Sequence, residues 1–296
     1  MLTPVLIRQM AGRTGTTLVM QLVGTSADVT YERTYPFERS YLAYLVEAQH
    51  RLARSAPSAT SGPTSGVSFA DLFLGRVPGI DGLGFDPEIV DMGAAGAVAF
   101  DPSCFCTIWR GFSDLVIRSA AGRSDRAPRP RFYAEKAVNG PNLKVSCPVV
   151  PLRAIRLVRD PRDVWASINS FDAQRGFHGF GRDDGQSRIS YLWFLVRNIA
   201  DNLGQTLPRH TESIVVRYED LVARLADEAA RIGSWLGVDL DAGAVARQRD
   251  QFRHHMTSTS EVASVGRWRT DIPAEEARFL WEQLGDELEK FGYAPD

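Results

Sequence analysis

Four short runs of hydrophobic and β-branched residues stand out along the chain, and each ends in a polar or glycine-containing turn. Such runs are typical of buried strands, and they cover residues 4–10, 131–138, 154–159 and 213–218. Helical spacing of apolar positions lies between and after them, at 16–23, 163–171, 189–207 and 221–236. This alternation predicts an α/β fold of three layers, with a central, mostly parallel sheet flanked by helices.

Long irregular segments interrupt this pattern. Residues 54–66 and 75–102 are rich in glycine, proline and small polar residues, and residues 174–188 combine glycines with aromatic and charged side chains. Strand signals lie on both sides of these segments, so we expect a single domain over residues 1–296. Long loops within one domain often border a ligand, and we expect this of the insertions at 50–130 and 174–188.

Composition and charge exclude several classes of protein. The 296 residues carry a net charge of −2, which gives no electrostatic reason to expect nucleic acid as a partner. No apolar run approaches the roughly 20 residues of a membrane-spanning helix. Three cysteines without the spacing of a disulfide framework favour a reducing, cytoplasmic location. Most basic residues of this chain are arginines, so each of its few lysines, among them Lys136, is more informative than usual.

The first predicted strand is followed directly by a glycine-rich turn and then by a helix. This order points backbone N–H groups at an anion, and it predicts a phosphate-binding loop. The turn lacks the lysine of the Walker motif, which argues against a magnesium-dependent ATP enzyme. The candidate ligand-binding residues of the loop are Gly12, Arg13, Thr14, Gly15, Thr16 and Thr17.

A second candidate anion site follows the predicted strand at 154–159. Asp160 and Pro161 are suited to cap and begin the next helix, which holds Arg159 at the strand end and Ser167 in the helix. An arginine and a serine placed in this way can converge on one anion.

These two segments together resemble the cofactor signatures of the sulfotransferase family. The pair Gly-Arg-Thr-Gly-Thr-Thr (12–17) and Arg-Asp-Pro-Arg-Asp-x3-Ser (159–167) carries the resemblance. Two later segments also match: the Tyr-Glu-Asp-Leu that begins at Tyr218, and residues 264–269, which include Arg267 and Trp268. Residues 45–130 contribute almost nothing to the likeness.

The resemblance implies a P-loop-like fold and the co-substrate 3′-phosphoadenosine-5′-phosphosulfate (PAPS). It implies that residues 12–17 hold the 5′-phosphosulfate, that Arg159 and Ser167 hold the 3′-phosphate, and that Tyr218 lies near the adenine. The C-terminal segment with Arg267 and Trp268 would close over the nucleotide. Sulfuryl transfer would release adenosine 3′,5′-bisphosphate and require no metal, and the paired thiols of Cys104 and Cys106 are weak evidence for one.

The acceptor must lose a proton, so the site needs a base. Relatives of this type often carry a glutamate near Glu32, which is the first choice; Glu38 is the fallback, and His178 is a third candidate in the loop at 174–188. Lys136 resembles part of a family Glu-Lys element and is expected to contact the transferred group, and Arg13 is expected to stabilise the leaving phosphate.

The acceptor is left open by the sequence. Aromatic residues and glycines in 35–112 and 174–182 suit a small molecule such as a natural product or a glycolipid, and they do not exclude a sugar or a peptide tyrosine. Two other functions remain as alternatives: a P-loop small-molecule kinase that uses ATP and magnesium, and a non-catalytic nucleotide-binding protein.

Overall fold

The computed structural model describes residues 1–33, 37–38, 40–42, 45, 103–121, 130–137, 151–205, 207, 211–248 and 256–295. Its centre is a five-stranded sheet in the order β2-β3-β1-β4-β5, and every pairing in it is parallel. The strands are β1 (Thr3–Gln9), β2 (Val29–Thr30), β3 (Phe132–Ala137), β4 (Leu152–Val158) and β5 (Thr211–Arg217). The predicted α/β class with a parallel sheet is therefore confirmed.

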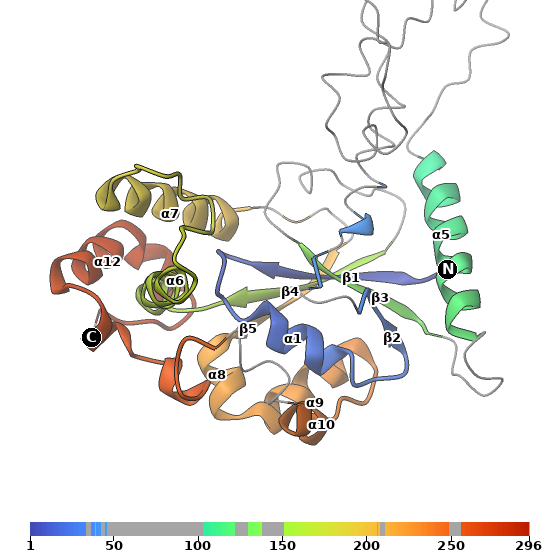
Figure 1. The fold of residues 1–296 in the computed structure, drawn as a ribbon. Helices are drawn as coiled ribbons and strands as arrows, with labels where there is room; N and C mark the ends of the chain where they lie inside the picture. The colour runs from blue at the N-terminus through green and yellow to red at the C-terminus, as the bar shows by residue number, and fades with distance from the viewer. Residues whose placement is uncertain are drawn as a thin grey trace, which may run out of the picture.

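Helices cover both faces of this sheet (Figure 1). The helices before β5 are α1 (Thr16–Val23), α5 (Ser103–Ala121), α6 (Pro161–Arg175) and α7 (Arg188–Leu203). Those after β5 are α8 (Tyr218–Ala223), α9 (Leu225–Leu236), α10 (Ala242–Gln248), α11 (Trp268–Asp271) and α12 (Ala274–Glu289), with a 3-10 turn at Val262–Ser264.

Alternating side chains of the strands feed separate hydrophobic clusters on the two faces. Val5 and Ile7 of β1 pack with α1, α9 and α10 on one face. Leu6 of the same strand packs on the opposite face with Trp109 of α5. A further cluster joins the end of β4 to α6, α7 and α12. The strands are thus buried on both faces, as a parallel sheet requires.

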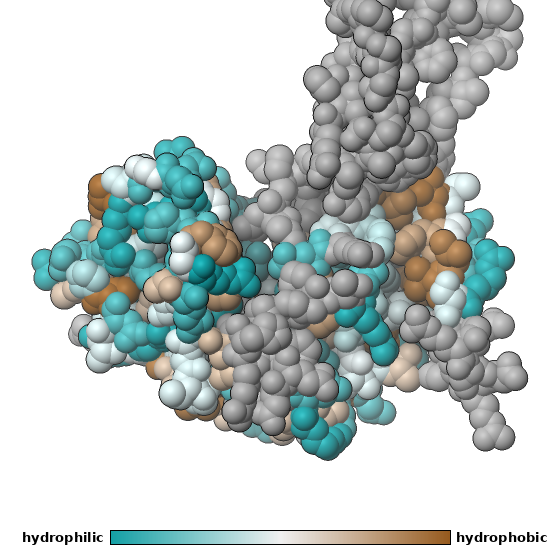
Figure 2. All heavy atoms as spheres, in the orientation of Figure 1, coloured by the Kyte–Doolittle hydropathy of each residue, from teal (hydrophilic) through white to brown (hydrophobic). Residues whose placement is uncertain are grey.

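Helix α5 lies in the segment where the sequence predicted only insertion and loop. Its inner face buries Trp109, whose indole nitrogen donates to the carbonyl oxygen of Leu2 at 2.8 Å. Its outer face carries Leu115, with 59% of its surface exposed, and hydrophobic residues gather over this helix in Figure 2. The irregular segments predicted at 54–66 and 75–102 lie outside the described residues.

Two helices differ from the prediction: one is divided in two and the other ends earlier than expected. The helix expected at 221–236 is divided into α8 and α9 at Arg224, which leaves the helical region with φ −139° and ψ 54°. The helix expected at 189–207 ends at Leu203 with Gly204 as its cap. Helix α6 begins as predicted, because the Asp160 carboxylate accepts from the amide of Arg162 at 2.9 Å.

Candidate active site

The carboxyl ends of four adjacent strands meet at one edge of the sheet. The loop after β1 lies there beside Lys136 of β3, Arg159 after β4 and Tyr218 after β5. Ligands of open parallel sheets bind at this edge. The topology therefore brings together the segments that the sequence singled out from distant positions.

The loop between β1 and α1 needs glycine at two positions. Gly15 has φ 104°, and a Cβ added there would lie 2.4 Å from the ring of Tyr218. A Cβ at Gly12 would lie 2.4 Å from the ring of Phe180. The loop is closed internally by the buried Thr14, whose hydroxyl donates to the carbonyl oxygen of Ala11 at 2.6 Å. The backbone is therefore shaped to present its amides and the start of α1 to a ligand.

Arg13 lies in this loop with φ 66°, and its guanidinium rests 4.5 Å from the ring centroid of Phe171. Its Nε donates to Ser167 Oγ at 3.1 Å, which links the first candidate anion site to the second. Burial lowers the pKa of Arg13 to about 10, and the charges of Arg159, Arg175 and Arg267 act in the same direction. Cations that repel one another in this way form a site suited to an anion of several charges.

Lys136 enters the same region from β3. Its Nζ donates to Thr17 Oγ1 at 3.1 Å and lies 3.7 Å from Glu38 Oε1. Burial lowers the pKa of Lys136 to about 8, although the Glu38 carboxylate acts in the opposite direction. A lysine with this pKa is able to give a proton as well as to stabilise negative charge.

Arg159 is held firmly at the end of β4. Its guanidinium donates to the carbonyl oxygens of Arg13 at 2.9 Å and Ser264 at 2.7 Å, and it stacks 4.2 Å from the ring centroid of Tyr218. Its Nε is buried and has no hydrogen-bond partner. The Tyr218 hydroxyl is within hydrogen-bonding distance of Ser264 Oγ at 2.9 Å. Arg159 therefore joins the phosphate loop, the start of α8 and the C-terminal segment.

The C-terminal segment reaches the second candidate anion site through Thr257. The hydroxyls of Ser167 and Thr257 are 3.1 Å apart, and Arg267 donates to Thr257 Oγ1 at 3.1 Å. Asp163 anchors the segment to α6 by accepting from the amides of Gly266 at 2.7 Å and Trp268 at 3.0 Å. Burial raises the pKa of Asp163 to about 6, against the effect of those two amides.

A cavity of about 560 Å³ opens between these groups. Its aromatic walls include Phe171, Phe177 and Phe180, and Arg175 lies at its edge. Eight of the residues predicted from the sequence line it: Gly12, Arg13, Gly15, Thr16, Thr17, Lys136, Arg159 and Tyr218. Most of the expected ligand-binding residues therefore share one cavity.

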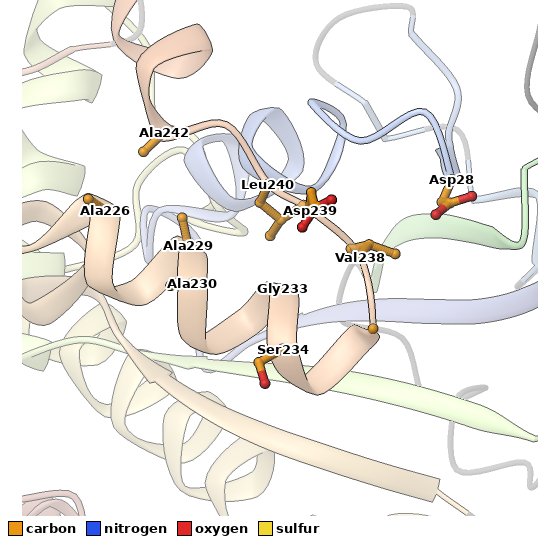
Figure 3. Close-up of a pocket in the computed structure, with 11 residues that line it drawn as sticks. Asp28, Ala226, Ala229, Ala230, Gly233, Ser234, Val238, Asp239, Leu240 and Ala242 are labelled. Carbon is orange, nitrogen blue, oxygen red and sulfur yellow. The ribbon is translucent and has the colours of Figure 1, made fainter.

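A second hollow of about 630 Å³ lies between α9 and the segment after it, with Asp28 at its rim (Figure 3). Its described lining carries two carboxylates and no basic side chain, and the rest is mostly small or apolar: Asp28, Ala226, Ala229, Ala230, Gly233, Ser234, Gly237, Val238, Asp239, Leu240 and Ala242. This lining does not suit an anion. The cavity at the phosphate loop is therefore the candidate active site.

The three candidate bases occupy different places. Glu32 accepts from the Tyr41 hydroxyl at 3.3 Å and does not line the cavity. Glu38 lines the cavity beside Lys136, with half of its side chain exposed. His178 Nδ1 lies 3.4 Å from an Asp172 carboxylate oxygen, and it is Asp172 that lines the cavity. The contacts favour the fallback Glu38 over the first choice Glu32.

Four other predicted ligand-binding residues do not line the cavity directly. Ser167 and Arg267 are connected to it through Arg13 and Thr257. The Thr14 hydroxyl is directed at its own loop, and the Trp268 ring lies 4.0 Å from the Arg162 guanidinium. Whether these four touch the nucleotide stays a prediction.

Sequence reasoning missed several residues of the site. Ser264 and Thr257 bond to Tyr218 and Ser167, and Phe171 and Phe180 pack against the phosphate loop. Ser264 opens a segment that the sequence had singled out, so a signal for it was present. Phe180 lies in the loop at 174–188 that the sequence expected to border a ligand, although its approach to Gly12 was not predicted. Phe171 carried no signal, because only the fold brings α6 against Arg13.

The described part of the chain shows neither a metal-binding cluster nor a membrane-spanning helix. No group of three or more histidine, cysteine, aspartate or glutamate side chains gathers there in a way that would hold a metal ion. None of the helices described is long and apolar enough to cross a membrane.

Parallel strands with a glycine loop at the carboxyl edge and a helix behind it define a P-loop-like nucleotide-binding α/β protein. Comparison with protein families is more specific, because the profile described as "Sulfotransferase domain" matches residues 11–287. The chain belongs to this family of enzymes, which confirms the family suggested by the two anion-site segments.

Curated relatives with similar sequences are carbohydrate sulfotransferases. The chain is 23% identical over 205 residues to carbohydrate sulfotransferase 1 of Mus musculus, a match that covers 64% of this chain and 50% of the relative. The human protein of the same name is 22% identical over 200 residues, covering 62% and 49%. The chain thus spans about half the length of the curated relatives it matches.

Solved structures show a distant likeness. The sulfotransferase domain of the olefin synthase of Synechococcus PCC 7002 has a TM-score of 0.46 at 18% identity, covering 99% of this chain and 96% of that one. Retinol dehydratase, solved with androsterone and inactive cofactor PAP, has a TM-score of 0.38 at 15% identity, covering 97% and 80%.

Proposed function

We propose that this chain transfers a sulfuryl group from PAPS to a hydroxyl or amine of a small-molecule acceptor and releases adenosine 3′,5′-bisphosphate. One observation carries the proposal: Arg13, Lys136 and Arg159, which come from separate strand ends, converge on a glycine loop at the start of α1. Such a site suits a nucleotide with two separate phosphate groups.

Two properties of the arginines in the cavity fit this co-substrate. Arg159 Nε is buried without a partner, and the pKa of Arg13 is lowered by neighbouring cations. A bound anion would accept a hydrogen bond from Arg159 and would favour the charged form of Arg13. We assign the 5′-phosphosulfate to residues 12–17 and the 3′-phosphate to Arg159, Ser167 and Arg267.

The residues of the cavity suit an in-line displacement. The acceptor oxygen forms a bond to sulfur while the bond between sulfur and the phosphate oxygen breaks, and the electron pair of that bond stays on the phosphate. Arg13 and the loop amides stabilise the charge on the leaving phosphate. Lys136 lies beside the loop and assists the same oxygen. Glu38 takes the acceptor proton, because it lines the cavity next to Lys136.

A transfer assay tests this function. The protein is incubated with PAPS and a mixture of hydroxyl compounds, and bisphosphate release and gain of one SO3 group are followed by mass spectrometry. We expect both with a chelator present and with PAPS alone as donor. Transfer of phosphate from ATP with magnesium, without sulfate transfer, would instead support a kinase. Binding of PAPS without any turnover would support a non-catalytic nucleotide-binding protein.

We propose a small molecule as the acceptor, such as a natural product or a glycolipid. The aromatic side chains of Phe171, Phe177 and Phe180 along the cavity support this, because they offer apolar surface to a ring or a chain.

A further inference from the structure

Gln21 carries a feature that the proposed reaction does not use. It lies in α1, is only 8% exposed and lines the cavity of the candidate active site. Its side-chain nitrogen is buried and has no hydrogen-bond partner. A buried amide without partners is costly, and such groups are rare in native proteins. A ligand that enters the cavity is therefore the natural partner for it.

The position of Gln21 in the helix indicates which ligand this is. Thr17 and Gln21 are four residues apart, so they share one face of α1, and both line the cavity. Thr17 accepts from Lys136 beside the phosphate loop. Gln21 lies one turn, or about 6 Å, further from the helix start that binds the phosphosulfate. The loop amides that bind the phosphosulfate are therefore not its nearest neighbours, which leaves the acceptor as the ligand that we expect it to contact.

The side chains beside Gln21 in the cavity include another neutral, polar group. Gln9, at the end of β1, also lines the cavity and adds a second carboxamide. A carboxamide presents a carbonyl acceptor and two N–H donors at the same end of the side chain. This combination pairs with hydroxyl groups, which both donate and accept, and it gives no advantage to an ionised group.

We propose that the Gln21 carboxamide binds a second, non-reacting hydroxyl of the acceptor, so that this site selects polyhydroxylated molecules over compounds with one hydroxyl. The inference rests on the proposed function, because it assigns the acceptor side of the same cavity. Gln21 is then a specificity-determining residue, and it plays no part in binding the nucleotide.

Two matched ring compounds test this: methyl β-galactoside, which bears several hydroxyls, and cyclohexanol, which bears one. Binding of each to the full chain saturated with adenosine 3′,5′-bisphosphate is measured by ligand-observed NMR. We expect Gln21→Met to weaken methyl β-galactoside binding about tenfold and to leave cyclohexanol and bisphosphate binding unchanged. Gln283→Met, an exposed position of α12, is the control and should change none of them.

The unfolding temperature of the variants tests the role of Gln21 without an activity assay. Without ligand, Gln21→Met removes an unpaired amide from the interior, so we expect the unfolding temperature to rise by about 2 °C or more. Gln21→Asn, which keeps the amide but shortens the side chain, serves as the second variant if the first fails to fold.

Three outcomes would overturn the inference: a fall in unfolding temperature for both variants, methyl β-galactoside binding that is unaffected by either, or no binding of this sugar to the wild type. Bisphosphate binding in the same samples shows separately whether the proposed function holds.

Discussion

Lys136 and Arg13 are cations whose surroundings disfavour their charge. Burial lowers the pKa of Lys136 to about 8, and Arg13 adds to this effect. Both side chains nevertheless point into a cavity beside a helix start, where an anion would restore the charged form. In the free protein the charged forms of these two side chains are therefore unfavourable, and an anionic ligand would stabilise them.

The lowered pKa of Lys136 makes the affinity for adenosine 3′,5′-bisphosphate depend on pH. Below pH 8 Lys136 is already protonated, whereas above it the free protein must take up a proton to bind the anion. We expect the affinity to fall as pH rises above 8, by at most about tenfold per pH unit. Calorimetry from pH 7 to 10 should show this slope in the wild type and not in Lys136→Met. Lys290→Met, at an exposed helix end, should keep it; an equal slope in Lys136→Met would show that this lysine does not face the phosphates.

The base can be identified by a matched pair of substitutions. Because Glu38 lines the cavity and Glu32 does not, we expect Glu38→Gln to reduce kcat about 100-fold to 10,000-fold. Glu32→Gln should stay near the wild-type rate. The reverse pattern, with activity lost only in Glu32→Gln, would support the first choice made from the sequence.

At the scale of elements, the sequence predicted the phosphate loop and the start of α6 well because their signals are local. Glycine at a positive φ and an aspartate cap are dictated by the nearest backbone. The division between α8 and α9 was not predicted, since apolar spacing continues across Arg224. The sequence ranked Glu32 above Glu38, whereas it is Glu38 that lines the cavity. Local sequence does not determine which of the two side chains reaches the cavity.

Asp163 is one of the residues that hold the C-terminal segment to α6, and it accepts from two amides of that segment. We expect Asp163→Ala to increase hydrogen exchange at Gly266 and Trp268, because each loses a bond to a buried carboxylate. Bisphosphate affinity should fall as well, since Arg267 lies between these residues.

Asp241→Ala is the control for this prediction. Asp241 also accepts from a backbone amide, that of Ala244 at the start of α10, away from the site. Protection of Gly266 and Trp268 that is unchanged in Asp163→Ala would mean that the segment is held in another way.

At the scale of the whole molecule, a parallel sheet collects distant chain segments at one edge. Hydrophobic runs predicted four of the five strands, without β2, and the resemblance of two segments predicted the family. Neither predicted the network that joins Arg13, Ser167, Thr257 and Arg267. That network includes contacts between residues 90 and 154 positions apart. Its residue types are common on protein surfaces, so the sequence alone offers little to distinguish them.

Calorimetric titration with adenosine 3′,5′-bisphosphate tests the central claim most directly. We expect micromolar or tighter binding that is the same with magnesium and with a chelator. Arg159→Ala, checked for folding by circular dichroism, should weaken this binding by about 1.5–3 kcal/mol, because a charge-assisted contact to phosphate is lost. Absence of binding without magnesium, or an affinity unchanged by Arg159→Ala, would contradict the assignment of this edge of the sheet as a PAPS site.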